Sequence, residues 1–376
     1  MNYDWQKIRL KEIGSVCMCK RILKYQTNTE KGIPFYKIGT FGKKADAFIS
    51  EELYKKYKDK YNYPEKGDIL ISAAGTLGET IVYDGKPAYF QDSNIVWLKH
   101  DSSKAINKFL LYVYAMKPWE VPESSTVPRL YNNNILNTYI LLPPLPEQEK
   151  IAEILGTWDL AIEKLTALIE QKKLLKKGLM QRLLNFKKEY LKRFDEIFED
   201  YSDKKHSDKD LLSATQENGV IPRRLLKGRV MSPEGSLDGY KLVQSGSFVI
   251  SLRSFQGGLE YSDYEGIISP AYTVLKDKIS INKCFYRYFF KSYNFIEKYL
   301  SIAVIGIRDG KQISYPDLQS VKIPYPPLSE QKAIADILSK ADEEIDLLTR
   351  KLSALKEQKT GLMQQLLTGK IRVKVA

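Results

Sequence analysis

The chain has 376 residues, of which 43% are hydrophobic and 28% charged, and its formal net charge is +13. This length allows two or three domains with buried cores. The sequence has no apolar run long enough for a membrane helix and no signal peptide, and its three cysteines are too few for a disulfide framework or a zinc site. We therefore expect a protein of the reducing cytoplasm.

The positive charge is unevenly distributed along the chain. Residues 1–146 carry a net charge of +6 and residues 185–329 carry +4, whereas residues 147–184 and 330–367 are nearly neutral at +1 and −1. The last nine residues add +3. A basic surplus on globular regions suits a polyanion such as nucleic acid. A lysine-rich background composition would produce the same surplus, so charge alone leaves both interpretations open.

The first region, residues 1–142, is expected to form a mixed α/β domain. Apolar strands are predicted at residues 66–72, behind a turn glycine, and at residues 94–99. An amphipathic, aromatic helix is predicted at residues 108–117. A further apolar strand at residues 138–142 closes the domain.

The segment that follows this region occurs twice in the chain. Aligning residues 143–184 with residues 326–367 gives 21 identities in 42 positions. Such internal repetition predicts one structural unit used twice. Prolines at the start of each copy, and Ser329 as a candidate N-cap, predict two helices of about 38 residues, each roughly 57 Å long.

Both copies carry apolar residues at alternating spacings of four and three, which is typical of a coiled-coil seam. We expect the two helices to pair along this seam, since so long a stripe needs another helix to cover it. Two separate amphipathic helices, each packed on its own domain, are the alternative. The residues expected at the helix-pairing and partner interface are Ile151, Leu155, Trp158, Ile162, Leu165, Ile169, Leu179, Ile334, Leu338, Ile345, Leu348, Leu352, Leu355 and Leu362.

Several residues interrupt the regularity of the predicted helices. Lys172 and Lys176 occupy seam positions, which suggests that the later half of the first helix is less buried. Gly178 and Gly361 recur at the same place in both copies, which suggests a close helix approach or a local break. The charge-rich residues 187–210 are compatible with an extension of the first helix.

The second globular region shows a fainter likeness to the first. Its strands are predicted at residues 245–251 and 271–276, its aromatic helix at residues 284–300 and its closing strand at residues 321–324. The chain therefore follows the order domain, helix, domain, helix.

The predicted fold is of the α/β (α+β) class, with two globular domains, two long antiparallel coiled-coil helices and a pseudo-two-fold internal repeat. The expected boundaries are 1–142 for the first domain, 143–186 for the first helix, 187–325 for the second domain, 326–368 for the second helix and 369–376 for a basic C-terminal tail.

Motifs for catalysis are weak throughout the sequence. The two histidines, His100 and His206, lie in unrelated contexts without a nucleophile motif nearby. Residues 39–44 lack the glycine spacing of a phosphate loop. We therefore expect no catalytic residue and no metal site, and favour a binding protein. An enzyme with an unrecognised site remains an alternative.

The duplicated Pro-Pro-Leu-x-Glu-Gln-x-x-Ile-Ala-x-Ile-Leu segment resembles the conserved helices of type I restriction–modification specificity subunits. Residues 126–130, 251–258 and 269–272 also resemble that family. The resemblance implies two target-recognition domains, each reading one half of a split DNA sequence, and helices that set the gap between the halves.

The same resemblance implies a non-catalytic chain that acts on double-stranded DNA, away from membranes. Its implied partners are two methylation subunits and the restriction subunits of a multisubunit complex. No cofactor is expected on this chain, because S-adenosylmethionine and ATP belong to those partners.

Candidate DNA-contacting residues lie in loops beside glycines, because base reading needs side chains on exposed turns and phosphate contacts come from lysine and arginine. Arg253 and Arg308 are the strongest candidates. A coiled-coil scaffold whose domains bind proteins is the alternative, and steep loss of DNA binding with rising salt would argue against it. The full set is Lys37, Thr40, Lys43, Lys44, Ser72, Thr76 and Arg129 in the first domain, and Arg223, Arg224, Lys227, Arg253, Ser254, Gln256, Arg308 and Lys311 in the second.

Overall fold

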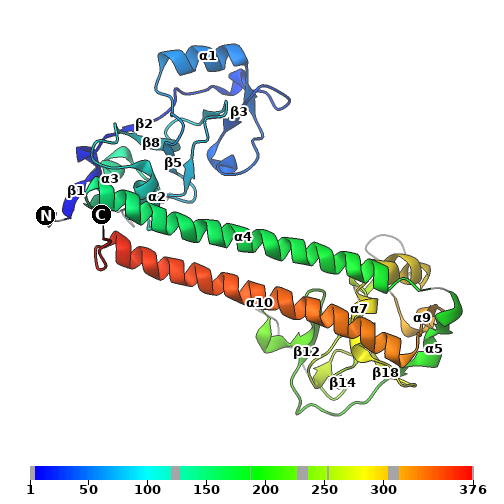
Figure 1. Ribbon diagram of the computed structural model, residues 1–376. Helices are drawn as coiled ribbons and strands as arrows, with labels where there is room; N and C mark the ends of the chain where they lie inside the picture. The colour runs from blue at the N-terminus through cyan, green and yellow to red at the C-terminus, as the bar shows by residue number, and fades with distance from the viewer. Residues whose placement is uncertain are drawn as a thin grey trace. The chain divides into compact units, whose positions relative to one another are not determined.

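The computed structural model describes residues 5–119, 128–186, 188–226, 236–251, 254–303 and 313–374. The chain divides into two compact units, which are described separately. Unit 1 comprises Met1–Lys164 and Leu352–Ala376, and unit 2 comprises Leu165–Lys351. Each unit therefore contains one globular domain and a segment of each long helix (Figure 1). The domain boundaries expected from the sequence stay a prediction.

The first domain is built on a four-stranded antiparallel sheet. Its strands lie in the order β2 (Ser15–Cys17), β8 (Ile95–Lys99), β5 (Ile69–Ser72) and β6 (Thr80–Val82). Helix α2 (Asn107–Ala115) buries five of its nine residues in a core that it shares with β5 and β8. Every residue of β5 is buried, as its unbroken apolar run predicts.

A smaller three-stranded sheet forms the outer part of this domain. Strand β3 (Ile33–Tyr36) pairs antiparallel with β4 (Phe48–Ile49) and parallel with β7 (Tyr89–Phe90). Helix α1 (Glu51–Lys60) follows β4, and the Ser50 hydroxyl caps its first turn. The remaining elements of the domain are η1 (Leu10–Glu12), η2 (Lys24–Gln26), η3 (Ile38–Thr40), α3 (Asn132–Asn137) and the antiparallel pair β1 (Gln6–Arg9) and β9 (Tyr139–Leu142).

The second domain contains an equivalent four-stranded sheet. Its order is β11 (Phe198–Tyr201), β18 (Thr273–Asp277), β15 (Phe248–Ile250) and β16 (Glu260–Tyr261). Helix α7 (Lys283–Phe290) packs its aromatic side chains into the core beneath this sheet. The remaining elements are η4 (Lys188–Tyr190), β10 (Leu191–Arg193) paired with β19 (Lys322–Pro324), α5 (Phe194–Ile197), β12 (Leu212–Thr215) paired with β13 (Gly219–Pro222), η5 (Arg223–Leu225), β14 (Lys241–Val243) paired with β17 (Gly266–Ile268), α6 (Ser254–Gly257), the π-helix η6 (Phe295–Leu300), α8 (Ser301–Ala303) and α9 (Tyr315–Leu318).

The two sheets match in strand order and in register. Leu70 of β5 pairs with Trp97 of β8, and at the equivalent place Val249 of β15 pairs with Val274 of β18. The strands predicted around residues 66–72 and 245–251 are the corresponding strands β5 and β15. The predicted internal repeat is therefore confirmed.

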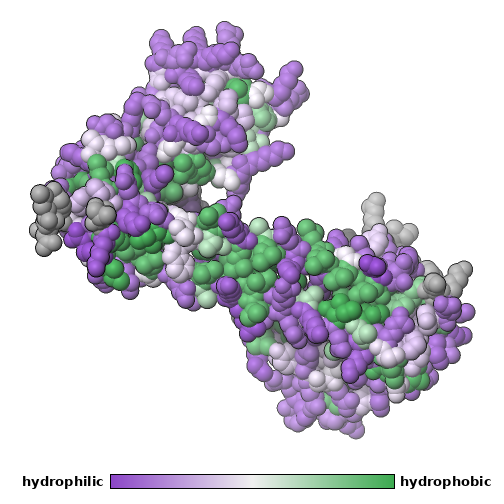
Figure 2. Space-filling model, viewed as in Figure 1, coloured by the Kyte–Doolittle hydropathy of each residue, from purple (hydrophilic) through white to green (hydrophobic). Residues whose placement is uncertain are grey.

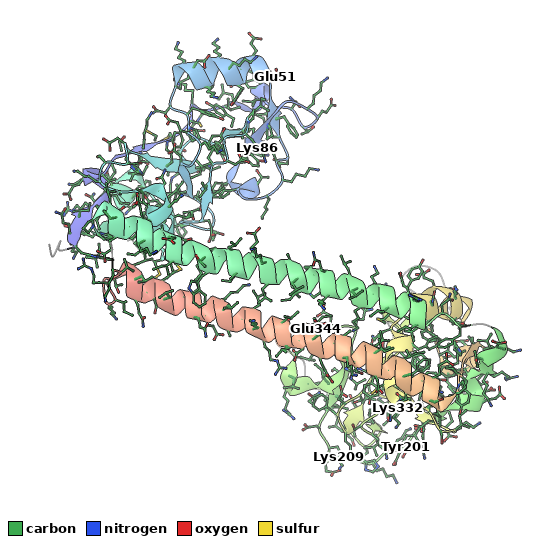
Figure 3. The ribbon with its side chains drawn as sticks, viewed as in Figure 1. Glu51, Lys86, Tyr201, Lys209, Lys332 and Glu344 are labelled. Atoms are coloured by element: carbon green, nitrogen blue, oxygen red, sulfur yellow. The ribbon has the colours of Figure 1, made fainter. Side chains whose placement is uncertain are left out.

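The two long helices are α4 (Leu145–Leu183) and α10 (Leu328–Leu367). Their segments run antiparallel within each unit (Figure 1). In unit 2 Lys172 faces Glu344 and Lys176 faces Asp342, so the residue numbers run in opposite directions. Glu344 lies on the side of α10 that faces α4 (Figure 3). All fourteen residues expected at the helix-pairing interface are buried or half-buried, whereas most residues between them are exposed.

Some details of the helices differ from the sequence-based expectation. Helix α10 begins at Leu328, so Ser329 lies inside the first turn and is not the N-cap. Gly178 and Gly361 lie within unbroken helices, and a Cβ atom added at either would meet nothing within 4 Å. Neither glycine therefore marks a close helix approach or a break.

The lysines in the seam of α4 are paired with acidic residues of α10. Lys172 contacts Glu344 at 2.6 Å and Lys176 contacts Asp342 at 2.5 Å. The side chains of these lysines are 29% and 22% exposed, so each is half-buried at its seam position. Ile151 and Leu155, earlier in the helix, are fully buried, so the later half of the seam is the less buried one, as expected.

Two predicted helices are shorter than expected. Helix α4 ends at Leu183, and residues 187–210 do not extend it, because β10 and β11 join the second domain's sheets there. The helix expected at residues 284–300 ends at Phe290 and resumes as the π-helix η6. The hydroxyl of Ser292 causes the interruption, because it donates to Phe289 O and accepts from the N–H of Phe295.

Candidate nucleic-acid interface

The first domain carries a cleft of about 690 Å³, and most of its lining residues are polar. Its lining includes Asn28, Lys37, Gln91 and Asn94, which come from three separate parts of the chain. Gln91 Oε1 accepts a 2.9 Å hydrogen bond from the N–H of Ile38, which fixes η3 beside the cleft. One asparagine or glutamine side chain can form two hydrogen bonds to the edge of an adenine, so the cleft is chemically suited to reading bases.

Several predicted DNA-contacting residues lie around this cleft. The glycine loop after β5 packs on η3, because the side chain of Ile38 lies 3.4 Å from the position of a Cβ at Gly75. Arg129 donates a 2.7 Å hydrogen bond to the carbonyl of Ser93, which lines the cleft. Lys37, also in the lining, forms an ion pair with Asp46 at 2.9 Å.

The other predicted residues of the first domain divide into exposed and structural groups. Lys43, Lys44 and Thr76 are exposed on turns. The hydroxyl of Thr40 caps η3 by hydrogen bonding to the backbone of Lys37.

Ser72 is buried and does not lie on an exposed turn, as was expected of a DNA-contacting residue. It is 2% exposed, and its hydroxyl donates to Thr76 O at 2.6 Å and accepts from the N–H of Glu79 at 2.9 Å. It shapes the glycine loop, and its buried hydroxyl is not presented at the surface for a DNA contact.

The second domain has a cleft of about 910 Å³ at the corresponding end of its sheet. It is lined by Gln216 and Asn218 in the β12–β13 turn, by Ser251 at the end of β15, and by Leu225 and Tyr272. Since β15 is the equivalent of β5, each domain has a cleft near the place where this strand ends. Ser251 lines the second cleft, and Ala73, just after β5, donates a hydrogen bond to the carbonyl of Asn94 in the lining of the first.

The predicted residues of the second domain are also mixed in character. Arg223 donates to Ser213 Oγ at 3.1 Å, and Arg224 forms an exposed ion pair with Asp210. Ser254 is 1% exposed and accepts a hydrogen bond from Ser251, so it shapes the loop, whereas Gln256 is exposed. The predicted residues Lys227, Arg253, Arg308 and Lys311 lie outside the described residues.

A buried ion pair fixes the loop after β15. Glu260 is 1% exposed, and its carboxylate lies 2.6 Å from Lys291 Nζ. The same ammonium donates to the carbonyl oxygens of Gly257 and Gln216, at 3.0 and 3.4 Å. Burial raises the pKa of Glu260, and the lysine opposes this shift. The ammonium joins α6 to the β12–β13 turn, and so holds in place Gln216 of that turn, which lines the cleft.

The amides that line both clefts were not predicted from the sequence. Gln216 and Asn218 carried a local signal, because the polar turn that ends at Gly219 is typical of a hairpin. Asn28, Gln91 and Asn94 carried none, since only the folded chain brings them together.

The part of the chain that the structure describes contains three free cysteines, of which Cys284 is exposed. No group of three or more histidine, cysteine, aspartate or glutamate side chains there could hold a metal ion. Cys17 and Cys19 are free and buried, and burial raises the pKa of Cys19 to about 12, which keeps it as an unreactive thiol. No helix among these residues is long and apolar enough to cross a membrane.

Two equivalent α+β domains, each with a polar cleft and a long helix, define a duplicated binding protein. A model of the type I restriction modification DNA specificity domain matches residues 2–173 and again residues 192–357. The chain therefore belongs to the family of type I restriction–modification DNA specificity subunits.

Individual relatives agree with this assignment. A Haemophilus influenzae protein provisionally named a type I restriction enzyme specificity subunit is 49% identical over 183 residues, which is 48% of this chain and 48% of that protein. The chain thus matches about half the length of this relative. The type I restriction enzyme MjaVIII specificity subunit of Methanocaldococcus jannaschii is 29% identical over 85% of this chain and 83% of its own length.

Solved structures show the same fold. The type I restriction–modification S subunit of M. genitalium has a TM-score of 0.54 at 16% identity, covering 97% of this chain and 96% of that one. A chain from a structural study of type I restriction–modification assembly has a TM-score of 0.58 at 14% identity, covering 97% of both chains.

Proposed function

We propose that this chain is the non-catalytic recognition subunit of a type I restriction–modification complex and that each domain reads one half of a bipartite DNA target. The observation that supports this proposal is the presence of a cleft in each domain, near the end of β5 in one domain and of β15 in the other. The clefts differ in their lining, as the readers of two different half-sites would. The basic surplus of both domains supplies the attraction to phosphates.

The paired helices would set the gap between the half-sites. The boundary between the units lies at Lys164/Leu165 in α4 and at Lys351/Leu352 in α10. Inserting one seven-residue heptad at both places leaves each unit intact and preserves the seam. The insertion adds roughly 10 Å of helix, which equals about three base pairs of DNA rise.

The experiment compares the gap in the methylated motif before and after insertion. We expect a gap longer by two to three base pairs with both half-sites unchanged. The control substitutes alanine for seven residues outside the seam at the same places, so the helix length does not change. It should leave the gap between the half-sites unchanged. An unchanged gap in a folded insertion variant would refute the role of the helices as a ruler.

Exposed leucines on the helices would dock the methylation subunits. Leu174, Leu175 and Leu347 are 68%, 57% and 61% exposed, although they lie on the helix pair of unit 2. Hydrophobic side chains are visible along this pair (Figure 2). A solvent-exposed apolar stripe beside a filled seam suits further helices from a partner.

Docking is tested by co-purification with the methylation subunits. Leu174→Lys with Leu175→Lys should abolish the complex but leave the melting temperature of the isolated chain within error. The matched control is Lys173→Gln with Lys177→Gln on exposed positions of the same helix turns. Assembly of the leucine variant at full yield would contradict the docking role.

The chain itself would need no cofactor. S-adenosylmethionine would bind to the methylation subunits, which modify DNA, and ATP to the restriction subunits, which cleave it. Methyl transfer by the purified chain alone, measured with labelled S-adenosylmethionine, would overturn this part of the proposal.

A further inference from the structure

Unit 1 contains a three-residue cluster where its domain meets the helix pair. Tyr112 of α2 donates a 2.7 Å hydrogen bond to Asp159 of α4, and Lys359 of α10 donates to the same carboxylate. The ammonium of Lys359 also lies 5.2 Å from the centre of the Tyr112 ring, within cation–π range. We call this arrangement the Tyr–Asp–Lys cluster.

Unit 2 contains the same three-residue cluster, in which the tyrosine also lies 3.3 Å from Ser339 Oγ. Tyr288 of α7 donates a 2.8 Å hydrogen bond to Asp342 of α10, and Lys176 of α4 pairs with that carboxylate. The ammonium again lies 5.2 Å from the centre of the tyrosine ring. The two aspartates, and likewise the two lysines, occupy identical positions in the aligned helix copies.

The lysine of each cluster comes from the helix that follows the other domain in sequence. Lys359 follows the second domain but completes the cluster of the first, and Lys176 follows the first domain but completes the cluster of the second. Each cluster therefore joins three elements: a domain helix, the long helix that follows that domain, and the opposite long helix. Hydrogen bonds to charged groups fix the relative orientation of the elements that they join, whereas an apolar contact can rearrange at little cost.

A second contact lies further along the same helix in each unit. Gln148 Oε1 accepts a hydrogen bond from the N–H of Ile106 just before α2, eleven residues before Asp159 on α4. The two contacts are thus about 16 Å apart along the helix axis. Two contacts at this separation fix the angle between the domain and the helix. A shift of about 1 Å at one contact would turn the domain by roughly 4° relative to the helix.

We propose that the Tyr–Asp–Lys clusters fix the angle of each recognition domain on the helix pair and thereby determine how strictly one gap between half-sites is selected. This inference rests on the proposed function above. Tyr112, Asp159 and Lys359, with their counterparts in unit 2, are positioning residues that need no contact with DNA. Burial raises the pKa of Tyr288 to about 12, so its phenol remains a hydrogen-bond donor at neutral pH.

The test uses the full chain assembled with its methylation subunits. Duplexes carry both half-sites, and the gap between them varies one base pair at a time. Tyr112→Phe and Tyr288→Phe each remove one hydroxyl and retain the ring. We expect the wild type to prefer one gap, and each variant to lose about tenfold of this preference, which corresponds to ~1.4 kcal/mol. The preferred half-site sequences should stay the same.

Matched controls are tyrosines whose hydroxyls bond within a domain. Tyr89 donates to Lys20 O at 3.1 Å in the first domain, and Tyr315 donates to Phe198 O at 2.8 Å in the second. Tyr89→Phe and Tyr315→Phe should lower stability but leave the gap preference as in the wild type. If Tyr112→Phe and Tyr288→Phe weaken binding equally at every gap, and so leave the gap preference unchanged like the controls, the clusters are merely structural and the proposal fails.

The lysines provide an independent variant. Lys359→Met and Lys176→Met keep an unbranched side chain and remove the charge, and each should broaden the gap preference like the tyrosine variants. An unchanged preference in both lysine variants would overturn the three-element role. A wild-type complex with no gap preference would refute the proposed function itself, whereas a wild-type preference that no variant alters would refute only this inference.

Discussion

The side chain of Gln148 accepts a 3.0 Å hydrogen bond from the N–H of Ile106, although the two residues lie 42 positions apart. Its amide nitrogen donates to Pro143 O and Lys104 O, both at 2.8 Å. Gln331 repeats the arrangement with Asn282 in unit 2. Both glutamines are fully buried, so the Pro-Pro-Leu-x-Glu-Gln motif joins each helix to its domain.

Replacement of Gln148 by alanine should destabilise unit 1. The change leaves one buried N–H and two carbonyls without their partner, and each unsatisfied group costs about 1–3 kcal/mol. We expect a total loss of about 2–4 kcal/mol in urea denaturation, since water can reach part of the gap. Gln181→Ala, on an exposed position of the same helix, should change stability by less than about 0.5 kcal/mol. Equal effects of the two variants would show that the motif glutamine does not link the helix to its domain.

Glu147 binds residues from near both ends of the chain and should give unit 1 a pH-dependent stability. Arg372 contacts its two oxygens at 2.8 Å each, and Trp5 Nε1 donates to it at 3.0 Å. Burial acts to raise the pKa of Glu147, but these hydrogen bonds outweigh it and the pKa is lowered. A lowered pKa gives stability above the ordinary glutamate value, and this stability is lost as the pH falls through the lowered value.

Glu147→Gln should therefore lower stability near neutral pH by about 1–3 kcal/mol and make the loss of stability in acid shallower. Thermal melts from pH 7 down to pH 3 measure both effects. Glu330→Gln is the control, because Glu330 is the half-exposed equivalent in the second helix copy. An acid profile of Glu147→Gln that runs parallel to the wild type would contradict the assignment.

Lys291→Met should damage the second recognition cleft more than the first. It leaves the Glu260 carboxylate buried and unpaired, which costs about 3–5 kcal/mol when a buried pair is broken from one side. Adding Glu260→Gln should recover most of this stability because the buried charge is removed. Binding to duplexes with one half-site scrambled should locate the defect at the second half-site. Equal losses at both half-sites would argue against a local role.

Lys43 and Gln256 should affect DNA binding in different ways. Lys43→Ala is expected to weaken binding to all sequences alike and to reduce the slope of log K against log salt by about 0.9, the value for one lost phosphate contact. Gln256→Ala is expected to cost about 1–3 kcal/mol at one base pair and to leave the slope unchanged. Binding titrations at several salt concentrations distinguish the two results. A change of base preference in the lysine variant would contradict the assignment of Lys43 to a phosphate contact.

The elements predicted most accurately were those with local signals. The glycine before β5 and the one before β15 precede unbroken apolar runs, and a seam of regular spacing marks α4 and α10. Each of these signals depends on residues within one segment. The equivalence of the two halves was also visible, because the helix copies share half of their residues.

Features that depend on distant residues could not be predicted in this way. The clefts gather Asn28 and Gln91 from separate loops, and the predicted contact Ser72 turned out to be buried by a local hydrogen-bonded loop. The ion pair of Lys176 could not be predicted, because its partner Asp342 lies on the other helix copy. Pairing between copies changes the meaning of a charged seam residue, and one helix considered alone does not reveal it.

Methylation-aware sequencing of a genome exposed to this chain and its methylation subunits tests the central claim most directly. The account predicts methylated adenines in a split motif, with two specified blocks separated by unspecified bases of one fixed length. Replacing the first domain should change one block and leave the other block in place. A single continuous motif, or a domain replacement that alters both blocks, would contradict recognition by two separate domains.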